Sequence, residues 1–330
     1  MKAPVDYIFP PVEVGSVPYW RLALRGCSQL CFQANELTGI CFFVAVFLAS
    51  PIACAYLLVA ALMAPGGRMQ LGVSDPVLAT GLPGLNPCLI ALALPAFFHT
   101  DWANVGMWGV LIVSVAVTIL LVRLCVAVLP FPTLALPFLL VFWALHALAP
   151  HLDILQPVDP QSANTSVFQP LIAVLFSLGQ AIFSPNAWSG LLFASGVLLS
   201  NWRHGLIAIF GALIGTTVSY YYRDIDPGSV NLGLYGFNGV LTAVSVFVIC
   251  GGKLRLSILG ALFATILMPA IANFGVPIVS APFVVTTWLM LVLGWAEDNW
   301  FRPLPESSAR AASSGEDRRL RSTSAQVSGD

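Results

Sequence analysis

Apolar segments follow one another between about residue 20 and residue 296, with only short polar breaks. Their lengths predict ten membrane-spanning helices, five on each side of a polar linker at 150–167. Several are shorter than the roughly 20 residues that a lipid-facing helix needs, so we expect protein to surround them. The predicted spans are 38–49, 51–64, 82–98, 105–128 and 134–149, then 187–200, 205–222, 234–250, 255–273 and 280–296.

The scarcity of charge requires lipid around these segments. Only 9% of the residues are charged and 58% are hydrophobic, whereas a soluble domain carries roughly 25% charged residues. The lipid bilayer is therefore an expected partner, and a net charge of −1 gives no reason to expect nucleic acid. Neither the seven cysteines nor the four histidines have metal-ligand spacing, and no cluster of nucleophiles indicates an enzyme. We expect no metal and no cofactor.

The positive charges predict an orientation. With both termini on the inner side, thirteen of the fourteen lysines and arginines fall inside and Arg223 alone falls outside. Cytoplasmic loops are enriched in these residues, so both termini are expected in the cytoplasm. Ion-coupled carriers usually have ionisable groups near the membrane midplane. The predicted spans contain no Asp, Glu or Lys, which favours passive flow of an uncharged solute over ion-coupled transport.

Five spans in each half make the second half enter the membrane from the opposite side. A weaker apolar piece precedes each set, at about 20–34 and 168–183, with a length that suits a re-entrant half-helix. The predicted fold is therefore an all-α integral membrane protein with ten transmembrane helices, two re-entrant half-helices and inverted five-helix repeats around a central pore. Its parts are an N-terminal cytoplasmic segment (1–19), a first repeat (20–149), an external linker (150–167), a second repeat (168–298) and a disordered cytoplasmic tail (299–330).

Three polar or proline-containing phrases occur twice, in the same order. The first, Q-x-x-F-x-x-N-x-x-x-G, begins at Gln29 and again at Gln180, 151 residues later. The second begins with Gly-Leu, contains a glycine and an asparagine, and occupies 81–89 and 233–241. The third, an apolar residue followed by P-x-x-small-x-P-F, occupies 131–138 and 276–283. Duplicated polar phrases in an apolar chain are typical of a transport path between two repeats.

Together these phrases resemble those of the urea transporter family, over about 20–296. The resemblance implies a channel-like path for urea through each subunit of a homotrimer in an inner membrane. It also implies that the glutamines accept urea N–H groups, that aromatic and leucine side chains form a slot, and that a hydroxyl lies at the constriction. On this chain the implied positions are Gln29, Phe32, Leu82, Leu85 and Ala135, then Gln180, Phe183, Leu234, Phe237 and Ser280.

Two positions depart from the family pattern. Leu85 stands where the family has Phe, and Ala135 stands where it has Thr, whereas Ser280 keeps the hydroxyl. One wall of the filter thus loses an aromatic face and a hydroxyl. This leaves open a channel of the same fold for another small neutral solute, such as a short amide, ammonia or water; an ion-coupled carrier is the more distant alternative.

Urea itself explains why these residue types are suitable. It is flat and neutral, with four N–H donors and one carbonyl acceptor, and losing its hydration is unfavourable unless the wall replaces those hydrogen bonds. Glutamine oxygens accept, flat rings form a slot and a hydroxyl donates. Structural roles remain alternatives: the glutamines as interhelical hydrogen-bond partners, and the asparagines as partners for backbone groups at broken helices. Glu36 is expected either to favour a helix N-terminus or to line the mouth.

Overall fold

The computed structural model describes residues 17–159, 167–221 and 225–300. The predicted cytoplasmic N-terminal segment lies almost entirely outside these residues, as do the predicted disordered tail from residue 301, part of the external linker and Arg223. The described chain falls into two compact units, residues up to Leu291 and residues from Val292 onward.

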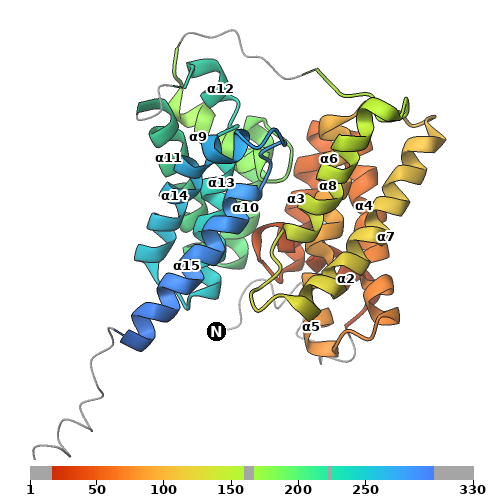
Figure 1. Cartoon of the computed structure of the whole chain (residues 1–330), viewed down its shortest axis with the longest axis horizontal. Coiled ribbons are helices and arrows are strands. Elements are labelled where there is room, and N and C mark those ends of the chain that lie inside the picture. Colours follow the sequence, from red (N-terminus) through yellow and green to blue (C-terminus); the bar gives the residue numbers. More distant parts are fainter. Residues whose placement is uncertain (1–16, 160–166, 222–224, 301–330) are drawn as a thin grey trace, which may run out of the picture. The chain divides into compact units, whose positions relative to one another are not determined.

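The described residues are helical, and they contain no β-strand beyond one isolated bridge between Phe98 and Pro157 (Figure 1). The first half contains α2 (Tyr19–Ser28), η2 (Gln29–Cys31), α3 (Glu36–Ala49), α4 (Pro51–Gln70), α5 (Asp75–Ala79), η3 (Leu82–Gly84), α6 (Leu85–Phe97), α7 (Val105–Val128), α8 (Leu136–Leu148) and η4 (Ala149–His151). The second half contains α9 (Pro170–Gln180), α10 (Ala187–Ser200), α11 (Trp202–Tyr221), α12 (Pro227–Asn231), α13 (Phe237–Ile249), α14 (Leu254–Ala272) and α15 (Ala281–Trp300).

Every predicted span overlaps a described helix, and an all-helical fold with several membrane-compatible apolar helices is confirmed. Four helices, α4, α7, α11 and α14, are long and apolar enough to cross a membrane, and α2 with α3 forms a further candidate bent by 74°. Five shorter apolar segments have 10–17 residues. The sequence did not predict the short helices α5 and α12.

Helix starts follow from capping side chains. Asn35 and Asn186 cap α3 and α10, and their side chains accept hydrogen bonds from the backbone N–H groups of Thr38 and Ser189. Such a cap satisfies one of the N–H groups that a helix start leaves without a partner. The asparagine of the first duplicated phrase therefore fixes where the helix after the break begins.

The glycine that ends the same phrase permits a close helix approach. A Cβ atom on Gly39 would lie 2.2 Å from the carbonyl oxygen of Leu24, and one on Gly190 would lie 1.9 Å from that of Leu175. Both distances are far inside van der Waals contact, so a larger residue would push α2 from α3 and α9 from α10. The first phrase thus contains a cap and a close-contact glycine in each half.

Left-handed backbone conformations recur at matched positions. The described non-glycine residues with positive φ are Phe32 (57°) and Phe183 (55°) in the first phrase, and Leu134 (47°) and Val279 (40°) in the third. This conformation is unfavourable for such side chains and persists only where the surroundings impose it. The two copies of each phrase therefore break their helices in the same way.

Helices α3 and α10 join the two halves through a reciprocal contact. Thr38 Oγ1, near the start of α3, donates to the carbonyl of Gly196 late in α10 at 2.7 Å. Ser189 Oγ, near the start of α10, donates to the carbonyl of Ala45 late in α3 at 2.8 Å. Because each start meets the other's end, the two helices run antiparallel.

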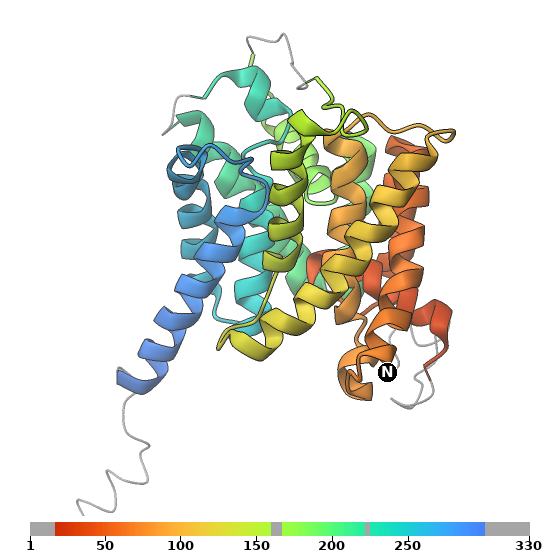
Figure 2. The same cartoon turned by 45° about the vertical axis from the view of Figure 1, so that its right-hand side comes forward.

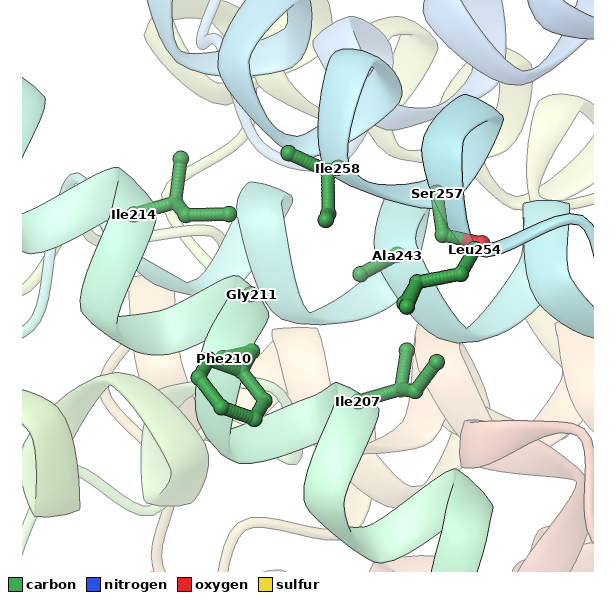
Figure 3. A pocket seen from close by; sticks show the side chains of 8 residues that line it. All are labelled: Ile207, Phe210, Gly211, Ile214, Ala243, Leu254, Ser257 and Ile258. Carbon is green, nitrogen blue, oxygen red and sulfur yellow. The ribbon is translucent and has the colours of Figure 1, made fainter.

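The helix bundle of the second half contains an apolar pocket. An apolar pocket of about 120 Å³ lies between α11, α13 and α14, and Ile207 and Ser257 are among its lining residues (Figure 3). In the first half, Tyr56 lies 151 residues before Ile207, and its ring is 4.6 Å from that of Trp108.

The second unit is described only through residue 300, at the end of α15. Within it, the rings of Trp295 and Trp300 lie 5.7 Å apart, and Asn299 Nδ2 donates to the carbonyl of Trp295 at 2.7 Å.

Candidate functional site

The third phrase of each half is held by the asparagine of the second phrase. Asn86 Nδ2 donates to the carbonyl of Leu134 at 2.8 Å, and Asn86 Oδ1 accepts from the N–H of Phe138 at 3.0 Å. The amide therefore spans the helix break on both sides of Ala135. The prediction that such asparagines satisfy freed backbone groups is confirmed.

The second half repeats this arrangement. Asn238 Nδ2 donates to the carbonyl of Val279 at 3.0 Å, and Asn238 Oδ1 accepts from the N–H of Phe283 at 3.3 Å. Ser280 lies between the two anchored residues. Ala135 and Ser280, the predicted constriction residues, are thus fixed by the same amide clamp in the two halves.

Aromatic contacts connect the first phrase of each half to the third phrase of the other. The ring of Phe32 lies 5.9 Å from that of Phe283, and the ring of Phe183 lies 6.2 Å from that of Phe138. Both distances are within the range for favourable tilted or edge-on ring pairs. Phe183 also approaches Phe97 at 6.3 Å. The duplicated phrases therefore meet across the boundary between the halves.

Two tryptophans add a second reciprocal contact. Trp143 Nε1 in α8 donates to the carbonyl of Pro277 at 2.9 Å, and Trp288 Nε1 in α15 donates to that of Pro132 at 2.8 Å. Each proline is the first proline of a third phrase. Each phrase is therefore fixed by an asparagine of its own half and by a tryptophan of the other half.

The two glutamines differ in their bonding. Gln29 is buried, and its Nε2 donates to the carbonyl of Thr80 at 2.7 Å, which orients the side-chain amide. Gln180 is partly buried at the end of α9, and its Oε1 is a buried acceptor without a hydrogen-bond partner. An unsatisfied buried polar atom is unfavourable by about 1–3 kcal/mol, so Gln180 is poised to accept a hydrogen bond from a ligand.

The remaining predicted residues occupy several environments. Leu85 and Ala135 are buried, Leu82 is 45% exposed, and Phe32, Phe183, Leu234 and Phe237 are intermediate. Ser280 is buried, and its Oγ has no hydrogen-bond partner. The second half thus supplies two unpartnered polar atoms, at Gln180 and Ser280. In the first half, the glutamine amide is tied to the backbone and the constriction residue is an alanine.

A buried ionic cluster beside the first phrase was not predicted. Glu36 Oε1 accepts from Arg21 Nε at 2.7 Å and from Arg25 Nε at 2.8 Å, and the Arg21 and Glu36 side chains are only 5% and 4% exposed. Arg25 Nη1 also donates to the carbonyl of Ala79 at 2.6 Å. Glu36 does open α3, as one expectation held, but its carboxylate neutralises arginines and does not line a mouth.

Two helices extend beyond the predicted charge-free spans and include charged residues. Helix α3 begins at Glu36, two residues before the predicted span, and α4 continues past the predicted end at 64 to include Arg68. Glu36, Arg21 and Arg68 are all buried. Arg21 and Arg68, which the sequence placed on the inner side, are therefore buried within the protein, and so is Glu36, which is paired there.

One further polar contact crosses between the halves. Gln33 in the first phrase is buried, and its Oε1 lies 3.2 Å from His204 Nδ1 in α11. Gln33 Nε2 also donates to the carbonyl of Cys31 at 2.8 Å. The matching positions, Ser184 and Ala53, have no side chains that form this pair, so the contact belongs to one half only. Within the described ranges, no group of three metal-ligating side chains comes together.

Comparison with known proteins now decides the family. The family model described as Urea transporter matches residues 20–294, which include every duplicated phrase. The chain belongs to the urea transporter family. Members of this family are transporters, not enzymes, and the membrane location of the chain agrees with its apolar helices.

Individual relatives are distant but match over most of their length. The chain is 24% identical over 306 residues to Urea transporter 1 of Ovis aries and, with the same figures, of Capra hircus. It is 24% identical over 314 residues to Urea transporter 1 of Rattus norvegicus. Each match covers 84% of this urea transporter family member and 78% of the relative.

Proposed function

We propose that this protein conducts urea passively across a membrane, through a narrow uncharged filter between its two halves. The proposed filter residues are Gln29, Phe32, Leu82, Leu85, Ala135, Gln180, Phe183, Leu234, Phe237 and Ser280. Family membership supports urea as the solute, and the meeting of the duplicated phrases across the halves supports the position of the filter.

The observation that carries the proposal is the pair of unpartnered polar atoms at Gln180 and Ser280. The glutamine oxygen accepts from a urea N–H, and the serine hydroxyl donates to the urea carbonyl. Each contact replaces a hydrogen bond to water that urea loses on entering. Gln29 contributes a second acceptor, because its amide nitrogen is already bound to Thr80.

Aromatic rings supply the flat walls. Phe32 and Phe183 each pack against a ring of the opposite half, yet both remain partly exposed. Their left-handed backbone conformation at a helix break is a strained feature of the kind that gathers at functional sites. We assign both rings to the sides of a slot for a planar solute.

We further propose ten transmembrane helices and two re-entrant half-helices in inverted five-helix repeats. The antiparallel, reciprocal bonds of Thr38 and Ser189 support a two-fold axis between the repeats. In a two-fold contact, if one residue of the first copy meets a second residue of the other copy, the reverse contact also forms. The axis crosses helices that would stand in the membrane, as expected for inverted repeats. The proposed setting is a homotrimer in a bacterial inner membrane, with both termini in the cytoplasm.

Passive transport follows from the absence of ionisable side chains among the proposed filter residues. Coupling to protons or sodium needs a group that changes its charge or binds the ion. The nearby carboxylate, Glu36, is neutralised by Arg21 and Arg25 and is not available for that role. Urea therefore moves down its own gradient.

The test is stopped-flow urea efflux from liposomes that contain the purified protein. The Gln180→Leu variant should insert normally and lose urea flux by roughly tenfold or more, since removing one hydrogen bond is worth about 1–3 kcal/mol. A matched control is Gln156→Leu, at an exposed position between the halves, which should retain full flux. Full urea flux in Gln180→Leu would remove this residue from the filter.

The same liposomes separate the alternatives. Urea flux that is unchanged by proton and sodium ionophores supports the passive mechanism, whereas flux abolished by an ionophore contradicts it. A preference for acetamide or ammonia over urea would instead indicate that Leu85 and Ala135 have altered the solute.

A further inference from the structure

A groove between α4 and α7, away from the proposed filter, has the properties of a lipid site. It has a volume of about 600 Å³ and is open on one side. Figures 1 and 2 show α4 and α7 side by side. Its apolar lining comes mainly from aliphatic side chains of the two helices, including Leu62, Met63, Ala116, Ile119 and Leu120.

Two of the lining residues, Tyr19 and Gly66, are joined by an unusual hydrogen bond. Pro65 lies inside α4 and removes one helical N–H. The hydroxyl of Tyr19 donates to the carbonyl of Leu62 and accepts from the N–H of Gly66 at 3.1 Å. It thus inserts into the helical hydrogen-bond ladder of α4 beside the proline. Gly66 and Gly67, both partly buried, are among the lining residues of the groove.

Positive charge lies at one end of this groove. Arg123 is one helical turn beyond Ile119 on α7, and its Nη1 donates to the carbonyl of Leu71, a lining residue. Arg68 follows the lining residue Gly67 on α4 and is only 7% exposed.

Arg68 lacks the partner that a buried arginine requires. Its Nε and Nη1 atoms are buried without a hydrogen-bond partner. A buried charge is strongly unfavourable unless it is paired. A phosphate between the two arginines would supply the missing negative charge, and Arg is well suited to phosphate because of its forked donors.

We propose that this groove binds one anionic phospholipid, with its phosphate at Arg68 and Arg123 and an acyl chain along α4 and α7. The apolar groove favours a lipid over a free anion, because a free anion has no acyl chain to place in it. The two arginines at one end favour an anionic lipid over a zwitterionic lipid, because the zwitterionic headgroup also carries a positive charge. Clustered basic residues at a membrane surface favour anionic lipids by about 1 kcal/mol for each residue.

The experiment measures lipid binding to the full-length protein in neutral detergent by native mass spectrometry. The three probes are phosphatidylglycerol, phosphatidylcholine and glycerol 3-phosphate, the last being a headgroup without chains. We expect phosphatidylglycerol to bind most tightly, and each of Arg68→Gln and Arg123→Gln to weaken it about fivefold. Arg203→Gln, which removes an arginine that lies over the ring of Trp202, should leave its binding unchanged.

A groove-filling variant tests the acyl chain separately. Ala116→Trp should weaken phosphatidylglycerol binding without changing the charge. Arg123 is exposed, so Arg123→Gln should fold even if Arg68→Gln does not, and it alone can decide the question. Equal binding of phosphatidylglycerol and phosphatidylcholine, unchanged binding in Arg123→Gln, or full competition by glycerol 3-phosphate would each overturn the proposal.

Discussion

Phe42 of α3 and Phe193 of α10 stack face to face, with ring centroids 4.8 Å apart and ring planes only 1° from parallel. They are separated by 151 residues, the same offset as the two copies of the first phrase. The reciprocal bonds of Thr38 and Ser189 lie on either side of them. The pair therefore marks the centre of the contact between the halves.

The Phe42–Phe193 pair should be energetically coupled. Phe42→Leu and Phe193→Leu should each destabilise the protein, and a double-mutant cycle should show a coupling of about 0.5–1.5 kcal/mol, as expected for a stacked pair. The measurement is thermal or denaturant unfolding in detergent. Phe47→Leu, on the exposed side of α3, should change stability little. Strictly additive losses in the double variant would mean that the rings do not support each other.

The sequence predicted most of the helices because hydrophobic runs and breakers are local signals. The starts of α7 and α10 fall where we expected them, since Asn104 and Asn186 cap helices there. Helix α4 runs past its predicted end and through Pro65, and the hydroxyl of Tyr19 bridges the carbonyl of Leu62 and the N–H of Gly66 beside this proline. No local pattern reveals a contact that comes from another helix.

The candidate site was predictable only as a set of residue types. Duplication identified the phrases, but the pairing of Phe32 with Phe283 depends on how the two halves face each other. Likewise, the positions of Arg21, Arg25 and Glu36 in the sequence do not indicate that they form one buried cluster. Such pairings arise from tertiary packing, which residue spacing does not encode when the partners lie on separate elements.

The asparagine clamps should matter for both folding and transport. Asn86→Ala leaves the carbonyl of Leu134 and the N–H of Phe138 without this partner, which should lower stability by about 1–3 kcal/mol for each group that stays buried and unpaired. Urea flux should fall as well, because Ala135 lies between the two anchored residues. Asn238→Ala should behave similarly.

Asn104→Ala serves as the control for these clamps. This substitution removes the cap at the start of α7, where Asn104 Oδ1 accepts a hydrogen bond from the N–H of Met107. Asn104 lies outside the duplicated phrases. We expect the free energy of unfolding to fall by about 0.5–2 kcal/mol and the urea flux per folded molecule to stay unchanged. If Asn86→Ala also retained full flux per folded molecule, the clamp would be structural only.

Glu36 should be the most sensitive charged residue in the first half. Glu36→Gln leaves Arg21 and Arg25 without their carboxylate, and breaking a buried ion pair in this way is unfavourable by about 3–5 kcal/mol. Adding Arg21→Gln should recover part of the loss, because it removes one uncompensated charge. Asp75→Asn, at an exposed helix start, is the comparison and should change the melting temperature little. A greater loss of stability in the double variant than in Glu36→Gln alone would contradict this explanation.

Urea flux should vary little with pH. None of the ten proposed filter residues titrates, so flux should stay within about twofold between roughly pH 5.5 and 8.5.

The stability of the protein has its own pH dependence at Asp226. Hydrogen bonds from Ser229 lower the pKa of Asp226 at the start of α12. Its stabilising effect is therefore complete above the ordinary Asp pKa of about 3.9 and is lost only as pH falls below that range. For the transport path, in contrast, a steep change of urea flux near pH 6.5 in the stopped-flow assay would indicate a titrating group among the residues that line it.

Ser280→Ala should separate function from stability. The Ser280 hydroxyl is buried without a partner, so its removal should leave stability unchanged or raise it by up to about 1–3 kcal/mol. Urea flux should fall, because the constriction then lacks a donor for the urea carbonyl in both halves, as Ala135 already lacks one. Ser219→Ala, which removes another buried, unpartnered hydroxyl, should give a similar stability change with full flux. Melting curves and urea efflux on the same preparations provide both readouts. A loss of stability together with full flux in Ser280→Ala would show that the hydroxyl serves packing and not the solute.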